Sequence, residues 1–336
     1  MDNMKTGRNV IVILIVSLVL VSCGTIEKQA MKSVADMLSS PSGSQAFTSD
    51  DDPQLVADSL PLALKIYEII LEKDPDNAEL AASTGKNFVM YSGGFVQMPA
   101  DMMEDEKWRE ADAARKRAKK LYRRGRDYLL MSLEIRHPGF TELLESQEYD
   151  AAASLLEVED ADEAYWAGLA WFGMASTDPF DMELTTTLDK AGLLLYKSLE
   201  LDPDNSGVHD VMIQIQLSLP PSILINLNQR SPHTAAFIDD FYQAAGAGDD
   251  AVKRAHYHYD RALALSEGSD PSPHLTMATA VSVKNQDVAG FRDYLDKALS
   301  IDPDMHAENR LMILLYQEKA RWLLEHIEDY FLVDFS

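Results

Sequence analysis

The chain has 336 residues, 46% of them hydrophobic, which is enough apolar material for a sizeable core and excludes disorder along the whole length. Fifty-five acidic residues against 30 basic ones leave a formal net charge of -25, which repels phosphate backbones and excludes sequence-independent binding of nucleic acid. The single cysteine excludes an internal disulfide framework and any cysteine-rich zinc or iron–sulfur site.

The first segment is typical of a sorting signal. Two basic residues precede the apolar run 10–21, which is too short for a comfortable membrane span. The run ends in Leu-Val-Ser-Cys-Gly at 20–24, which resembles the lipobox of bacterial lipoprotein precursors. By that resemblance, residues 1–22 are a signal peptide and Cys23 is the acylated first residue of the mature protein, which two or more acyl chains hold in the membrane. The alternatives are a plain signal peptide, or a transmembrane anchor, with Cys23 incidental.

Residues 23–52 are predicted to link this anchor to the body of the protein. Apolar residues at steps of three and four, among them Val34 and Met37, predict an amphipathic helix over 25–38, close to the membrane. Residues 39–52 are rich in Ser, Pro, Gly and Asp, and we expect them to form a flexible tether that does not pack.

The body, 53–336, is predicted to be all-α, because Ala, Leu, Glu, Lys and Met dominate long segments with helical spacing. One pattern recurs before several helix ends: a small residue, a large residue four positions later, and a further packing residue three positions after that. The last two copies of this pattern are about one tetratricopeptide (TPR) unit of roughly 34 residues apart, and the earlier copies are separated by about two units. This predicts a TPR-like solenoid of antiparallel helix pairs. Its expected packing positions are Ala63, Tyr67, Ala191, Leu195, Ala255, Tyr259, Leu295 and Ala298.

No familiar catalytic motif is present: the chain lacks a nucleophile elbow, a Walker loop, His-Glu-x-x-His and an EF-hand loop. His256 and His258 point to different faces of a helix, so they do not form a metal pair. Asp74, Asp202 and Asp302 open Asp-Pro-Asp turns, where capping of the next helix explains them without acid–base chemistry. We therefore expect no enzymatic activity, no cofactor and no metal; a hydrolase of unfamiliar type would require polar residues converging in a pocket.

Basic residues gather between 109 and 126, an island in an otherwise acidic chain. Two interpretations are open. The segment is either a solvated helix that answers the acidic surface of the protein itself, or a docking patch for an acidic partner or anionic lipid headgroups.

Large aromatic residues gather at two places with small residues beside them. Trp166 and Trp171 share one predicted helix, and Phe88, Tyr91 and Phe95 surround a pair of glycines. Core packing is the default interpretation of such residues. The alternative is a groove for an apolar ligand or a partner, since small residues between aromatic rings leave space.

Several segments then match one family in order along the chain. They are Asp-Asp-Pro-Gln-Leu-Val at 51–56 with Leu60-Pro61, Asp-Pro-Asp-Asn at 74–77, Tyr91 with Phe95-Val96, the helix from Tyr165-Trp166 to Trp171, the segment 248–263, and the ending 320–324 with 329–331. Together with the lipobox they resemble the TatT family, lipoprotein T components associated with tripartite ATP-independent periplasmic (TRAP) transporters. The resemblance implies a TPR-like homotrimer that partners the periplasmic substrate-binding P component and offers an apolar crevice or central pore to a ligand. Such systems use ion gradients and carry organic acids or other small ligands.

We predict a membrane-tethered adaptor in the bacterial envelope, facing the periplasm, that binds the P component and passes an apolar or amphipathic ligand. The alternative is a TPR scaffold lipoprotein for envelope or outer-membrane assembly that has no ligand. A small molecule extracted from the purified protein would separate the two.

Overall fold

A computed structural model describes residues 33–218 and 221–332, and within these ranges every regular element is helical, which confirms the all-α class. The helices are α2 (Pro41–Thr48), α3 (Pro53–Lys73), α4 (Ala78–Met90), α5 (Met98–Asp101), α6 (Trp108–Arg136), α7 (Phe140–Glu145), α8 (Tyr149–Leu155), α9 (Ala161–Thr177), α10 (Met182–Thr185), α11 (Leu188–Leu201), α12 (Ser206–Ser218), α13 (Pro221–Arg230), α14 (Pro232–Ala244), α15 (Ala251–Leu265), α16 (Ser272–Met277), α17 (Val288–Leu299) and α18 (Arg310–Glu325), with π-helical turns η1 (Tyr91–Gln97) and η4 (Ala278–Ser282).

The predicted signal peptide 1–22 and Cys23 lie outside the described residues. Of the helices that the structure does describe, none combines the length and the apolar character that crossing a membrane requires.

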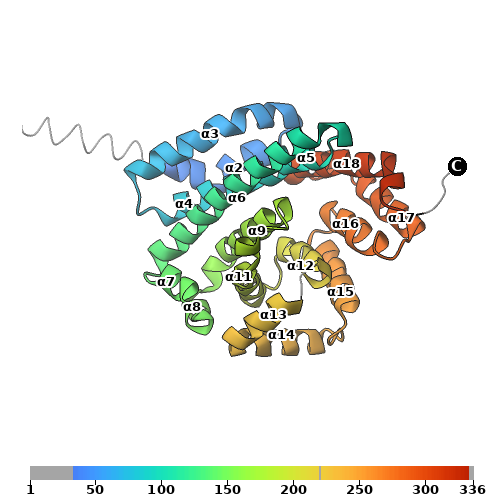
Figure 1. Cartoon of the computed structure of the whole chain (residues 1–336). Coiled ribbons are helices and arrows are strands. Elements are labelled where there is room, and N and C mark those ends of the chain that lie inside the picture. The colour runs from blue at the N-terminus through green and yellow to red at the C-terminus, as the bar shows by residue number, and fades with distance from the viewer. Residues whose placement is uncertain (1–32, 219–220, 333–336) are drawn as a thin grey trace, which may run out of the picture.

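The helices follow a circuit that closes on itself (Figure 1). The first half packs α4 against α6, α6 against α9 and α9 against α11. The second half runs through α12 with α15 and α16 with α17 to α18, which returns to α2 and α3. Leu311 and Leu315 of α18 belong to the same core cluster as Leu60 and Leu64 of α3. The two ends of the body therefore share one core.

Small residues let the helices of the first half approach until their backbones meet. Where α4 crosses α6, a Cβ on Gly85 would lie 2.7 Å from the carbonyl oxygen of Gly125 and 2.6 Å from Leu129 Cγ. Where α9 crosses α11, a Cβ on Gly168 would lie 2.5 Å from Leu195 Cγ. Of the eight predicted packing positions, Ala63 is partly buried and the others are buried. The TPR arrangement itself stays a prediction.

The predicted flexible tether is wrong for much of 39–52, because α2 occupies Pro41–Thr48 and packs against α18. The hydroxyl oxygen of Ser40 caps the first turn of α2, and Phe47 packs against the main core. Arg310 Nη1 donates to the carbonyl oxygen of Ser49 at 3.4 Å. A single aromatic residue, rather than a periodic apolar stripe, holds this helix, so the polar composition hid it.

The chain is also helical just before α2, over residues 33–39. Ala35 is fully buried there, and Tyr67 Oη donates to the carbonyl oxygen of Leu38 at 2.9 Å, which fixes this turn against α3. Val34 and Met37, on the predicted apolar face, are exposed instead. The helix therefore docks through a face other than the one that its periodicity indicated.

The predicted capping by the Asp-Pro-Asp residues holds only for Asp302, which caps the short 3-10 turn that follows it. α4 and α12 are capped instead by Asn77 and Asn205, whose side-chain oxygens accept backbone N–H groups of the first turn. Each asparagine stands three residues after the first acidic residue, Asp74 or Asp202. The Asp-Pro-Asp residues therefore form the turn between two helices, and the asparagine that follows them caps the next helix.

Candidate functional site

The five aromatic residues of the predicted groove share the main core. Phe88, Tyr91 and Trp171 are buried members of that cluster, whereas Phe95 and Trp166 are partly buried and pack against it. The rings of Tyr91 and Phe95 stack with centroids 6.0 Å apart. Their positions agree with the core-packing interpretation, and the aromatic groove stays a prediction.

The basic residues of α6 are largely engaged within the protein. The Arg124 and Arg126 guanidinium groups lie over the rings of Phe88 and Trp171, at 5.0 Å and 4.6 Å from the ring centroids. Lys119 Nζ forms ion pairs with two carboxylates, Asp178 at 2.8 Å and Asp181 at 2.5 Å. These contacts favour the interpretation in which the basic helix answers the acidic groups of the protein itself.

A cluster of hydrogen-bonded polar side chains lies where η1, α6 and α9 meet. Tyr122 Oη donates to Gln97 Oε1 at 2.8 Å, and Gln97 Nε2 donates to Ser176 Oγ at 3.0 Å. A Cβ on Gly173 would lie 2.5 Å from the Tyr122 ring, and one on Gly93 would lie 2.9 Å from its hydroxyl oxygen. Glycine at these two positions makes room for the phenol, and the π-helical turn positions Gln97 to meet it.

A second cluster of polar side chains joins α12 to α16. The Asp210 carboxyl group accepts hydrogen bonds from Ser272 Oγ at 2.6 Å and Thr276 Oγ1 at 3.3 Å. Asp270 Oδ1 accepts from the backbone N–H of Ser272 at 2.9 Å. Burial, and then the charge of Asp270, raise the pKa of Asp210 to about 7. Two carboxyl groups in such surroundings share their ionisation, so one proton is retained near neutral pH.

Tyr165 of α9 and Tyr316 of α18 lie near the carboxyl groups of the second cluster. Burial raises the pKa of both phenols, and the charge of Asp210 raises them further. Tyr316 also lies near Tyr122, whose pKa burial raises above its usual value. On the same helix, burial lowers the pKa of Lys319, and the carboxylate of Asp101 opposes this.

Tyr165, Asp210, Tyr316 and Lys319 each keep part of their surface accessible to solvent. Burial is nevertheless the main cause of their shifted pKa values. The mutual effects of their charges and the hydrogen bond from Ser272 show that most of these groups lie near one another, and Lys319 follows Tyr316 by about one turn of α18. We call this cluster the interior site, and its residues are Tyr122, Tyr165, Asp210, Asp270, Ser272, Tyr316 and Lys319.

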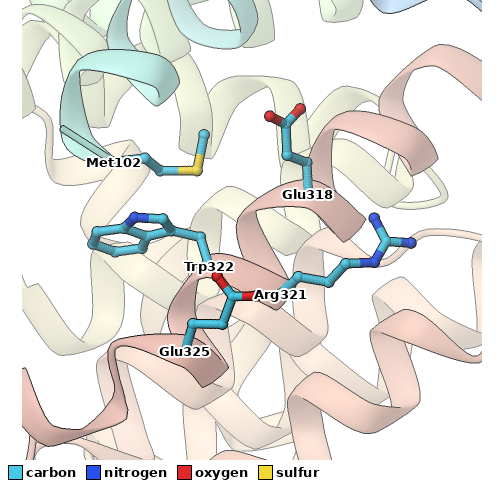
Figure 2. A pocket seen from close by; sticks show the side chains of 5 residues that line it. All are labelled: Met102, Glu318, Arg321, Trp322 and Glu325. Carbon is cyan, nitrogen blue, oxygen red and sulfur yellow. The ribbon is translucent and has the colours of Figure 1, made fainter.

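An outer cavity of about 330 Å³ lies between α18 and the end of α5 (Figure 2). It is lined by Met102, Glu318, Arg321, Trp322 and Glu325. Figure 2 shows the Met102 thioether beside the indole of Trp322, with the charged side chains of α18 at the rim. All the lining residues except Met102 come from the stretch of α18 that also carries Tyr316 and Lys319.

A fully paired polar network lies in the core between α12, α14 and α15. His209 Nε2 donates to the carbonyl oxygen of Pro203 at 2.9 Å, and its Nδ1 lies 2.8 Å from His258 Nδ1. The Tyr242 hydroxyl donates to His258 Nε2 at 2.7 Å. These contacts assign the proton to Nε2 of His209 and to Nδ1 of His258. Burial lowers the pKa of both imidazoles.

His256 is exposed and His258 is buried in this network, so the two side chains lie on different faces of α15, as their spacing predicts. Among residues 33–218 and 221–332, no three His, Cys, Asp or Glu side chains gather in a way that could hold a metal ion.

We expect the histidines to take up protons in a defined order. The pKa of His326 is raised by its hydrogen bond to the Trp322 carbonyl and by Glu104, whereas burial and the charges of His209 and Arg254 lower that of His258. In an NMR titration of the imidazole C–H signals, His326 should titrate above pH 6.5 and His258 well below it. A midpoint for His258 at or above 6.5 would contradict the neutral network.

The substitution Asp210→Asn is expected to stabilise the protein at pH 8 by about 1–3 kcal/mol. The native carboxyl group has its pKa raised from 3.8 to about 7, so the stability that it contributes is complete below pH 3.8 and is lost as pH rises to about 7. Asparagine removes this loss and still accepts the bond from Ser272. Urea unfolding at pH 4 and pH 8 measures the difference. The exposed Asp204→Asn serves as control, and an equal response of both variants would contradict the buried carboxyl pair.

Sequence reasoning missed the interior site. Asp210, Tyr316 and Lys319 stand singly in amphipathic helices, where a polar residue normally marks the solvent side. The one local signal was Asp270-Pro-Ser, which predicts a capped helix start but no binding site. Their convergence depends on the closure of the circuit.

The described residues form an all-helical protein whose helices close into a circuit, with a cluster of phenols and carboxyl groups between them. More specifically, the chain belongs to the TRAP transporter T-component family, whose model matches residues 49–223 and 237–331. An uncharacterised protein of Treponema pallidum (strain Nichols) is 31% identical over 293 residues, which are 86% of this chain and 83% of that protein. These findings confirm the family resemblance and a TRAP-associated role. The family is one of transport components and not of enzymes.

Proposed function

We propose that the protein is a membrane-tethered periplasmic adaptor of a TRAP-type system, which binds the soluble substrate-binding P component and holds a small amphipathic ligand in the interior site. The observation that carries the proposal is the family match over most of the chain. The lipobox at 20–24 supports the tether, since acylation of Cys23 attaches the protein to a membrane and its export places the body outside the cytoplasm.

The chemistry of the interior site supports a ligand that is apolar along its body and polar at its ends. Tyr122, Tyr165 and Tyr316 offer ring faces as well as hydroxyl groups. Asp210 supplies a carboxyl group, and Lys319 supplies an amine. A purely apolar molecule would place apolar surface against the ammonium group of Lys319, which is costly in surroundings of low polarity.

The adaptor role is tested with the mature lipoprotein in detergent, titrated with the substrate-binding protein of the same TRAP system. We expect a complex of defined stoichiometry by light scattering, with the homotrimer that the family resemblance implies as its core. Absence of a complex at any concentration, together with capture of outer-membrane assembly proteins, would favour the scaffold instead.

The ligand role is tested by native mass spectrometry of the purified protein and by tryptophan fluorescence. Tyr316→Phe and Lys319→Met should weaken retention of the co-purified molecule, whereas Lys253→Met on the outer surface should not. If Trp166→Ala and Trp171→Ala fold normally and alone abolish binding, the ligand occupies the predicted aromatic groove rather than the interior site.

A further inference from the structure

α3 carries apolar residues on two faces. The inward face contributes buried residues such as Leu60 and Leu64 to the main core. The outward face carries Leu55, Leu62, Ile66 and Ile69, whose exposed fractions lie between 42% and 67%. At about 100° per residue these four positions fall within a stripe roughly 60° wide. We call them the outer stripe.

The core does not explain the outer stripe. Exposed apolar residues scattered singly are normal, but four of them aligned along one helix mark a surface that another body covers. Figure 1 shows α3 along an outer edge of the molecule. Between Leu55 and Lys73 the exposed charged residues are Asp58, Lys65, Glu72 and Lys73, so this part of the face is close to neutral, and exposed Asp51 and Asp52 precede it. In a chain of net charge -25 this neutrality sets the face apart.

The described chain begins beside this same helix. Ala35 belongs to a buried cluster with Tyr67, Ile70 and Leu71 of α3, and Val34 and Met37 of the same turn stay exposed. Cys23 precedes residue 33 by ten positions in the sequence. Ten residues span at most about 35 Å when extended and about 15 Å as a helix. An acylated Cys23 therefore holds α3 within a few tens of ångströms of the bilayer.

We propose that the outer stripe of α3, together with Val34 and Met37, is a docking face for the bilayer itself, seated at the boundary between headgroups and acyl chains. The proposal rests on the proposed acylation of Cys23, which delivers the face to the membrane. Apolar burial drives the contact, and the balanced charges make it insensitive to salt and to the fraction of anionic lipid. In the docked state we expect Lys73 to place its ammonium group among the headgroups, while the ammonium group of Lys65 stays paired with Glu68 at 2.9 Å.

The test uses the full chain with acylated Cys23, in vesicles of phosphatidylethanolamine and phosphatidylglycerol. Because Cys23 is the only cysteine and acylation consumes its thiol, Leu62→Cys or Ile66→Cys introduces a single site for an environment-sensitive fluorophore. We expect blue-shifted emission at these sites and quenching by nitroxide groups on the acyl chains. Phe180→Cys, at a residue 90% exposed in the α9–α10 connection, is the control and should remain quenched by aqueous iodide.

Equal access of iodide to the labels at 62 and 180 in vesicles would overturn the proposal. Shielding of the label at 62 that is already complete without vesicles, and that disappears on dilution to monomers, would instead assign the stripe to a second copy of the chain.

A non-acylated chain separates this proposal from the tether. Cys23→Ser should bind vesicles weakly, and adding Leu62→Gln, Ile66→Gln and Ile69→Gln should reduce its partitioning by about tenfold or more, with unchanged circular dichroism. If mass spectrometry finds no acyl chains on native Cys23 while these substitutions still abolish vesicle binding, the tether fails and the docking face stands. If acylation is present and the substitutions change nothing, the docking face fails and the tether stands.

Discussion

Replacement of Gly85 by alanine is expected to lower the free energy of unfolding by about 2–4 kcal/mol. A Cβ at this position would lie 2.7 Å from the carbonyl oxygen of Gly125 and 3.1 Å from the backbone nitrogen of Leu129. Because these are backbone atoms, no side-chain rotation relieves the clash, and α4 must move away from α6. Urea unfolding followed by circular dichroism measures the effect.

Gly192→Ala in α11 is the matched control. A Cβ there would meet Leu227 Cδ2 at 3.2 Å, the far end of a flexible side chain. Alanine also gains roughly 1 kcal/mol of helix propensity over glycine. We therefore expect this variant to match or exceed the stability of the native protein. A Gly85→Ala variant of native stability would show that the crossing of α4 and α6 is not close-packed.

Loss of the Asp160 carboxylate is expected to destabilise the protein by about 3 kcal/mol. Asp160 is 1% exposed and accepts hydrogen bonds from Arg136 Nη1 at 3.1 Å, His137 Nε2 at 2.7 Å and the backbone N–H of Glu157 at 2.9 Å. Asp160→Ala leaves these donors in place around an empty position, at the start of α9. Differential scanning calorimetry measures the loss.

The same residue predicts an acid-side dependence. Burial alone would raise the pKa of Asp160, but the bonds from Glu157, His137 and Arg136 outweigh it and lower the pKa below 3.8. The stability that the carboxylate supplies is therefore present above pH 3.8 and is lost as pH falls through the lower value of the folded state. Asp160→Ala should flatten this acid-side slope. Asp162→Ala, at a half-exposed ion pair with Lys86, should leave it intact.

Local patterns predicted the all-α class, because helical spacing is a property of each segment by itself. The pairs Ala191 with Leu195 and Leu295 with Ala298 lie in the core because a small and a large residue on one helix face suit a close crossing wherever the partner comes from. The tether was mispredicted because α2 is held by distant groups: Arg310 reaches Ser49 across 261 residues of sequence. Composition carries no information about such a partner.

The interior site escaped prediction for a related reason. Tyr165, Asp210 and Tyr316 come from three helices, and no local pattern around Asp210 or Tyr316 points to a site. Polar residues of this kind are ordinarily placed in water, and only the return of α18 to the start of the body surrounds them with protein. The aromatic residues attracted attention because of their size, yet most of them complete the core.

The packing of α18 on α2 and α3 also decides how the molecule comes apart. An open array of helical repeats unfolds unit by unit, since each unit touches only its neighbours. Here the last helix secures the first, so fraying at either terminus removes contacts from the other. Denaturation should follow a single cooperative transition, and truncation before Arg310 should loosen the amino-terminal helices although they lie more than two hundred residues away in the chain.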